Sequence, residues 1–152
     1  MAYVRIWVHA VWGTKKREPI LEKESRYKLF EHIRENAKAK DIYIDFINGY
    51  TDHVHVLISL GAEQTMAKVM QLIKGEASHW ANQNTLLKHK LSWADEYFAV
   101  SVSESMVNKV RNYIENQEEH HRHKTFAEEC EEFIAKYGFV KIKDSSAFNV
   151  GG

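Results

Sequence analysis

Apolar residues in this chain follow two different spacings, and the order of those spacings constrains the fold more than any other feature. In residues 3–13, 42–46, 53–60 and 97–102 they recur at every second position, the period of a β-strand with one buried face. Residues 22–40 and 65–82 instead repeat them at every third or fourth position, as helices with one buried stripe do. The predicted order is therefore strand, helix, strand, strand, helix, strand.

That order is the split βαβ, or ferredoxin-like, pattern of an α+β fold. It predicts an antiparallel sheet with two helices on one face and the other face free. The pair Asn48-Gly49 predicts the turn before the strand of residues 53–60. Two more helices are expected after the fourth strand, one over residues 103–121 with Ser103 as its N-cap and one over residues 125–137. We expect residues 1–143 to form a single domain and residues 144–152 a flexible tail.

The composition is that of an ordinary soluble globular protein. The chain has 152 residues, of which 44% are hydrophobic and 28% charged, and its net charge is zero with histidine neutral. Overall charge therefore gives no signal for a nucleic-acid partner, and phosphate contacts must come from local basic residues. Lys15 and Arg17 in one basic cluster, and Lys74 beside Gly75, are candidates, although a solvated side chain is the simpler interpretation of each.

Cysteine usage and the N-terminus bear on where the protein works. Cys130 is the only cysteine, which excludes an internal disulfide and a cysteine-rich zinc site and suits a reducing compartment. The N-terminal apolar segment has no basic region before it and is interrupted by Arg5 and His9, so we expect neither a signal peptide nor a membrane span. The predicted location is the cytoplasm.

Two histidines stand one residue apart in the apolar run of residues 53–60. The strand period places His53 and His55 on the same face, with Val54 and Val56 pointing the opposite way, toward a core. Two imidazoles on one face could hold a metal ion between them. They could equally be two half-exposed histidines without a role, and the pair alone does not decide between these interpretations.

A second informative stretch lies in the helix expected over residues 103–121. Tyr113 and Gln117 are four residues apart, so they stack on one side of a helix, beside an apolar line that points them inward. That line consists of Met106, Val110 and Ile114. A cation held by two histidines and the amide oxygen of Gln117 would keep positions open for a substrate oxygen, with Tyr113 placed as a nucleophile. His121 continues the line as a further candidate ligand, although solvent exposure is the favoured interpretation.

Several segments together resemble one family. DHVHVL resembles the His-hydrophobic-His motif of the HUH endonucleases, and YIENQ resembles the nucleophile helix of their single-tyrosine transposases. LIKGEASHW is similar to the second-helix signature of that family, and VWGTKKREPIL to its first strand and the following loop. Residues 93–139 resemble the C-terminal part of the transposases of small bacterial insertion sequences, to which the REP-associated tyrosine transposases are close relatives.

The resemblance implies a mechanism and assigns roles to residues. His53, His55 and Gln117 would bind Mg²⁺ or Mn²⁺, which polarises the scissile phosphate of single-stranded DNA. Tyr113 would attack that phosphorus, leaving a free 3′-OH and a covalent 5′-phosphotyrosine. Attack by another 3′-OH would reverse the step and join strands without nucleotide hydrolysis.

The resemblance also implies partners. The protein would be a homodimer, in which the tyrosine of one subunit can complete the histidine site of the other, and it would recognise a DNA hairpin near each element end. Two alternatives remain open: a catalytically silent, host-adopted regulator that binds hairpin DNA, and a metal-dependent phosphodiesterase that uses water. The second would tolerate Tyr113→Phe.

Overall fold

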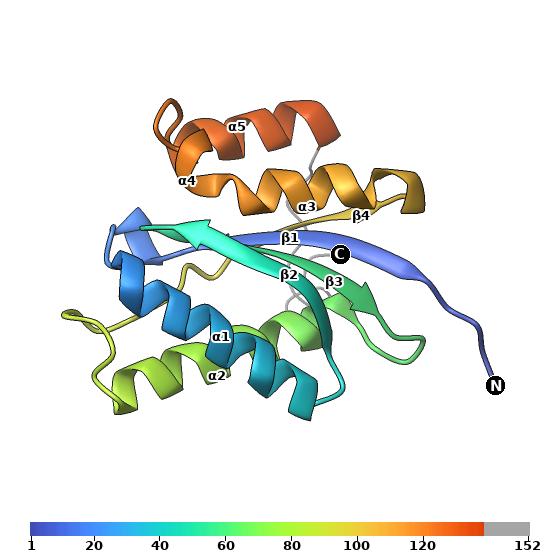
Figure 1. Cartoon of the computed structure of the whole chain (residues 1–152), viewed down its shortest axis with the longest axis horizontal. Coiled ribbons are helices and arrows are strands. Elements are labelled where there is room, and N and C mark those ends of the chain that lie inside the picture. The colour runs from blue at the N-terminus through green and yellow to red at the C-terminus, as the bar shows by residue number, and fades with distance from the viewer. Residues whose placement is uncertain (139–152) are drawn as a thin grey trace, which may run out of the picture.

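Figure 1 shows the computed structural model, which describes residues 1–138 as four strands and five α-helices. The expected tail, residues 144–152, and the end of the expected domain lie outside the described residues. The strands are β1 (Ile6–Gly13), β2 (Tyr43–Tyr50), β3 (His53–Leu60) and β4 (Phe98–Val102). The helices are α1 (Lys23–Ala39), α2 (Met66–Gln83), α3 (Val107–Glu115), α4 (Gln117–His120) and α5 (Phe126–Tyr137), with 3₁₀ turns η1 (Lys15–Arg17) and η2 (Glu104–Met106). Within residues 1–138, no helix is long and apolar enough to cross a bilayer.

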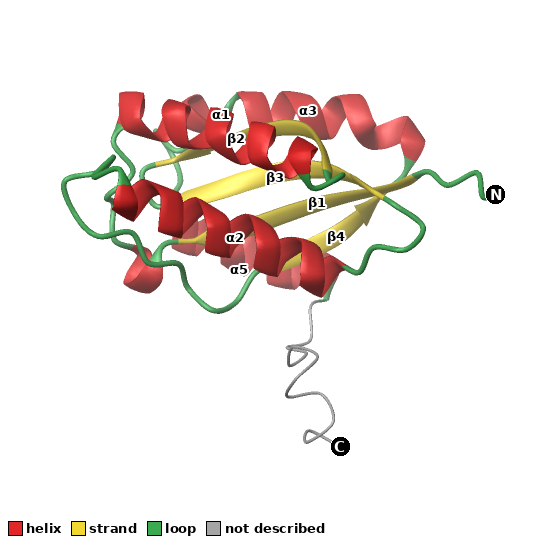
Figure 2. Ribbon diagram, turned by 90° about the horizontal axis from the view of Figure 1, so that it is seen from below, coloured by secondary structure: helices red, strands yellow, loops and turns green. Residues whose placement is uncertain are grey.

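The four strands form one antiparallel sheet in the order β2-β3-β1-β4. This is the ferredoxin-like arrangement, so the predicted fold class is confirmed. Figure 2 shows α1 and α2 side by side across one face of the sheet. The main core lies between them, where Val54, Val56 and Ile58 of β3 meet Leu29, Ile33, Val69 and Ile73 of the helices. The strand period therefore predicted correctly which side of β3 enters this core.

The opposite face of the sheet is covered, so the prediction of a free face was wrong. The helices α3, α4 and α5 lie over it (Figure 1). Two smaller apolar clusters join them to the sheet: one is made by Trp7, Leu57, Val107 and Ile114, the other by Val11, Phe126 and Cys130. An amphipathic helix needs an apolar partner, and the second face of β1 and β3 supplies one. The central strands are consequently buried on both faces.

The covered face also changes what supports a dimer. The free face was one argument for dimerisation, and that argument no longer holds. Val4 and Ile6, at the start of the first strand, are 40% and 43% exposed, and they remain apolar residues open to a partner. Met106, expected on the inward line of the nucleophile helix, is also 43% exposed.

The β2–β3 hairpin closes later than predicted. Pairing continues through Gly49 and Val54 to Tyr50 and His53, so the turn is at residues 51–52 and the predicted Asn48-Gly49 turn was wrong. Gly49 serves a different purpose, because a Cβ at that position would overlap the carbonyl oxygen of His53. The backbones of the two strands approach each other so closely there that only glycine fits. The true turn places Asp52 directly beside His53.

The helix predicted over residues 103–121 is divided. It begins with η2 and is interrupted at Asn116, between α3 and α4. Ser103 does precede the first turn, but its side chain makes no capping hydrogen bond. The next helix agrees with the prediction, since α5 begins after Thr125 in a reciprocal capping box with Glu128.

Candidate metal and nucleophile site

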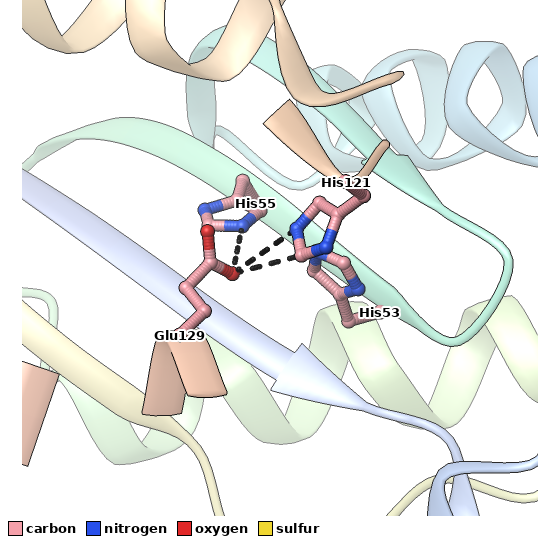
Figure 3. A group of neighbouring side chains, drawn as sticks. All are labelled: His53, His55, His121 and Glu129. Carbon is pink, nitrogen blue, oxygen red and sulfur yellow. Dashed lines mark hydrogen bonds and ion pairs between the residues drawn. The ribbon is translucent and has the colours of Figure 1, made fainter. Parts of the chain in front are cut away.

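Four potential metal ligands meet between the sheet and the helices that cover its second face. β3 supplies His53 and His55, the end of α4 supplies His121, and α5 supplies Glu129 (Figure 3). One ligand atom from each lies within 4.8 Å of all the others. The side chains of these residues are at most 2% exposed. The prediction that His53 and His55 project from the same face holds, but solvent exposure of His121 was wrong.

The imidazoles converge on a single carboxylate oxygen. Glu129 Oε1 lies 3.1 Å from His55 Nε2, 3.5 Å from His53 Nε2 and 3.5 Å from His121 Nε2. Sequence reasoning missed Glu129 entirely. The signal that could have found it is a carboxylate on the buried stripe of α5, between Phe126 and Phe133. A charged residue in that position is seldom buried without a partner.

The outer nitrogens of two of these rings are fixed by groups that only accept hydrogen bonds. His53 Nδ1–H donates to Asp52 Oδ1 at 2.7 Å, and His121 Nδ1–H donates to the Lys124 carbonyl at 2.7 Å. In the neutral rings both Nε2 lone pairs therefore point inward. A hydrogen bond from the outer nitrogen to a carboxylate or a carbonyl is how proteins orient a histidine that binds a metal.

His55 is held by another histidine. Its Nδ1 lies 2.9 Å from Nε2 of His9, a buried residue of β1, and the two rings stack with centroids 5.1 Å apart. Burial, with the neighbouring imidazoles, lowers the pKa of His55 to about 4 and that of His9 to about 3. Both rings are neutral near neutral pH, and the neutral imidazole is the form that binds metals.

The donor set fits a divalent cation. Among the described residues, the buried Nε2 of His121 has no hydrogen-bond partner. Gln117, also fully buried, places its Oε1 3.0 Å from His53 Nε2. In the His53 tautomer whose single proton is on Nδ1, beside Asp52, lone pairs of His53 and Gln117 face each other. Burial alone raises the pKa of Glu129, yet the imidazoles of His121 and His55 outweigh it, and the net pKa is far below normal. A cation would satisfy all of these acceptors together.

Tyr113 lies at the other oxygen of the same carboxylate. Its hydroxyl donates to Glu129 Oε2 and lies 3.3 Å from His120 Nε2. The Tyr113 ring packs edge-on against His55, with centroids 5.6 Å apart. Burial, followed by the charge of Glu129, raises the pKa of the phenol above its ordinary value. The structure thus brings Tyr113 to the histidines of its own chain. His120 also reaches this carboxylate, with its Nε2 3.1 Å from Glu129 Oε2.

The candidate DNA-binding residues divide into two groups. Arg17 lies near the site, with Cζ 5.9 Å from the centroid of the Phe126 ring, which in turn stacks on His53 at 4.2 Å. Arg17, Phe126 and their neighbours line a pocket of about 270 Å³, and Lys15 lines an adjacent one of about 240 Å³. Lys74 belongs to α2, on the opposite side of the sheet, and its ammonium donates to the Ala94 carbonyl at 2.7 Å.

Two solved structures of other proteins are similar to this fold. The fold is similar to a crystal structure of a putative transposase from Deinococcus radiodurans R1, with a TM-score of 0.59 and 24% identity over 77% of this chain and 95% of that one. It is also similar to a REP-associated tyrosine transposase bound to a REP hairpin, with a TM-score of 0.58 and 17% identity over 80% of this chain and 72% of that one.

Sequence comparison assigns the family. Residues 2–117 match the family described as "Transposase IS200 like", so the chain belongs to the IS200-like transposases. The ISDra2 transposase TnpA of Deinococcus radiodurans is 28% identical over 114 residues, which cover 72% of this chain and 81% of that protein. The family predicted from the sequence motifs is thereby confirmed.

Proposed function

We propose that this transposase cuts and rejoins single-stranded DNA through a covalent bond to Tyr113, with a divalent metal held beside His53 and His55. One observation carries the proposal: the hydroxyl of Tyr113 and the inner nitrogens of both histidines meet at the two oxygens of Glu129. A nucleophile and a set of metal ligands therefore share one enclosed site.

In the proposed reaction Tyr113 Oη attacks the phosphorus, and the bond from phosphorus to the 3′ oxygen breaks. The 3′ oxygen leaves as a hydroxyl, and the 5′ phosphate stays on Tyr113. The pKa of Tyr113 is raised, so the phenol must lose its proton as it attacks, and Glu129 already accepts that hydrogen bond. Mg²⁺ or Mn²⁺, held by His53, His55 and Gln117 as in the resembling family, would polarise the phosphate oxygens. Another 3′-OH reverses the step and transfers the strand.

A hairpin-bearing single strand is the proposed substrate. The hairpin-bound relative of the same fold supports it, and so does the basic loop after β1. In that loop Lys16 and Arg17 have φ angles of 58° and 55°, a costly conformation for residues other than glycine, which presents two cations beside the pocket at Phe126. We propose that Lys15 and Arg17 bind phosphates near the cut and that Lys74 binds at most a distal part of the DNA.

We further propose a homodimer whose active sites are each built from one chain. The support for the second part is the hydrogen bond between Tyr113 and Glu129 of the same chain. Mixing a His55→Ala protein with a Tyr113→Phe protein tests this arrangement. Active sites within one chain predict no recovery of cleavage, whereas exchange of tyrosines between subunits predicts partial recovery.

The central experiment looks for the covalent intermediate. Hairpin-bearing single-stranded DNA from the flanks of the gene is incubated with protein and Mn²⁺ and separated on a denaturing gel. We expect a protein–DNA adduct that contains the DNA 3′ of the cut and is lost with Tyr113→Phe or with EDTA. Tyr43→Phe, a change at an exposed tyrosine of β2, is the matched control and should leave the adduct unchanged.

Two other outcomes would replace the proposal. Cleavage without an adduct would establish a hydrolase that uses water. DNA binding without cleavage, in Mg²⁺ and in Mn²⁺, would establish a regulator. One observation favours that alternative: His53, His55 and Gln117 are fully buried while α5 is in place.

A further inference from the structure

We propose that the metal centre of this transposase consists of four residues, His53, His55, His121 and Glu129, and that the bound metal anchors α5 to the sheet. The inference rests on the proposed function and deepens it. It concerns the chain without DNA, with α5 in place, in which an imidazole and a carboxylate from the C-terminal part of the chain take the position of the Gln117 amide proposed for the reaction. The part of the chain that matches the family ends at residue 117, so His121 and Glu129 both lie beyond it.

The choice between Glu129 and Gln117 follows from geometry and charge. Glu129 Oε1 is within 3.5 Å of the inner nitrogens of all three histidines. Gln117 Oε1 approaches His53 Nε2 at 3.0 Å, while its amide nitrogen donates to the Tyr113 carbonyl at 3.2 Å. A buried carboxylate needs a counter-charge, which a neutral amide does not. A divalent cation among the three imidazoles supplies it.

His121 provides a second indication that a cation binds here. Its Nδ1–H is committed to the Lys124 carbonyl, and its Nε2 is buried without a hydrogen-bond partner among the described residues. An orphaned buried acceptor costs free energy unless something binds it. The atom faces Glu129 Oε1, so the same cation would satisfy both groups.

The donor chemistry selects the metal. Three imidazoles and one carboxylate suit first-row transition metals such as Mn²⁺, Co²⁺ and Zn²⁺, whereas Mg²⁺ prefers a shell of oxygens and water. Four protein ligands also make a closed site. Since Glu129 comes from α5 and two of the histidines come from β3, metal binding joins that helix to the centre of the sheet.

Cobalt titration of the full chain, without DNA, tests the ligand set. We expect one Co²⁺ per chain, with visible absorption typical of a site rich in nitrogen, displaced by Zn²⁺ but not by the same concentration of Mg²⁺. Glu129→Gln and His121→Asn should each weaken Co²⁺ binding by about 10-fold or more and alter the spectrum. Gln117→Ala should change the affinity by no more than about 2-fold. Glu131→Gln, an exposed carboxylate two positions along α5, is the matched control.

Hydrogen exchange of the full chain, with and without Co²⁺, provides a second readout. Co²⁺ should slow amide exchange across α5, and this effect should be absent with Glu129→Gln. The inference is overturned if Gln117→Ala weakens Co²⁺ binding as much as His53→Ala does while Glu129→Gln leaves Co²⁺ binding unchanged. It is also overturned if the rate of amide exchange in α5 is the same with and without Co²⁺. Neither result depends on the Tyr113 adduct, so failure of this inference and failure of the proposed function are distinguishable.

Discussion

Acidification should destabilise the metal-free protein well before its carboxylates titrate, because two buried histidines remain neutral in the folded state. Burial is the main reason why the pKa is lowered from 6.5 to about 3 for His9 and to about 4 for His55. The unfolded chain therefore binds protons that the folded chain does not, and the free energy of unfolding rises with pH. Stability that is fully present above about pH 6.5 is lost as the pH falls toward the folded-state values.

The magnitude is set by the unfolded state. At about pH 5 both folded-state rings are still neutral, whereas an unfolded histidine is almost fully protonated, which favours unfolding by about 2 kcal/mol per ring. The two rings together give about 4 kcal/mol between about pH 7.5 and pH 5. That is a large share of the roughly 5–15 kcal/mol that stabilises a domain.

Urea unfolding in EDTA at constant ionic strength, repeated across this pH range, measures the effect. The variant His9→Asn should lose about half of the pH dependence, while His89→Asn, a change at an exposed histidine, should keep all of it. A free energy of unfolding that is constant within about 0.5 kcal/mol from pH 7.5 to pH 5 would refute the burial argument.

Three further changes test single contacts. Asp52→Asn removes the carboxylate that orients His53, so metal affinity measured by calorimetry should fall about 10–100-fold, and unchanged affinity would contradict that role. Gly49→Ala places a methyl group against the His53 carbonyl, so the melting temperature should fall sharply; an unaltered one would mean that the strands separate easily there. Thr125→Ala deletes the capping box of α5, which should cost about 1 kcal/mol in urea unfolding, and no loss would show that α5 does not depend on its cap.

The order of elements was predictable because each element has its own period. Alternation in β1 and β3 and the stripes of α1 and α2 are local properties, and the ferredoxin-like topology follows from their sequence order. The position of the hairpin turn was not predictable, because Asn48-Gly49 has the composition of a turn although it lies within β2. Glycine was selected there by close approach to His53, a contact between strands that no local pattern reveals.

The side-by-side placement of Tyr113, Gln117 and His121 was predicted from a continuous helix, and it survives although the helix is interrupted. Backbone hydrogen bonds close the turn on each side of Asn116: its N–H donates to Asn112 O at 3.1 Å, and the N–H of His121 donates to Gln117 O at 2.9 Å. Across the interruption, the side-chain amide of Gln117 donates to the Tyr113 carbonyl at 3.2 Å. The four-residue spacing therefore keeps its geometry. The burial of His121 could not be predicted in the same way, because it depends on α5 closing over the end of α4.

The closure of α5 also connects the metal site with access to DNA. A phosphate cannot reach histidines that are fully buried, and the groups that bury them include Phe126, stacked on His53 at 4.2 Å, and Glu129. Both belong to α5. If the protein acts on DNA as proposed, α5 must leave this position before a phosphate can enter. The Glu129 carboxylate would leave with α5, and the negatively charged phosphate oxygens would take the place of that negative charge. On that proposal the same helix would complete the cation site in the resting protein and exclude the substrate from it, and the Tyr113 hydroxyl, which donates to Glu129, would be released as α5 opens.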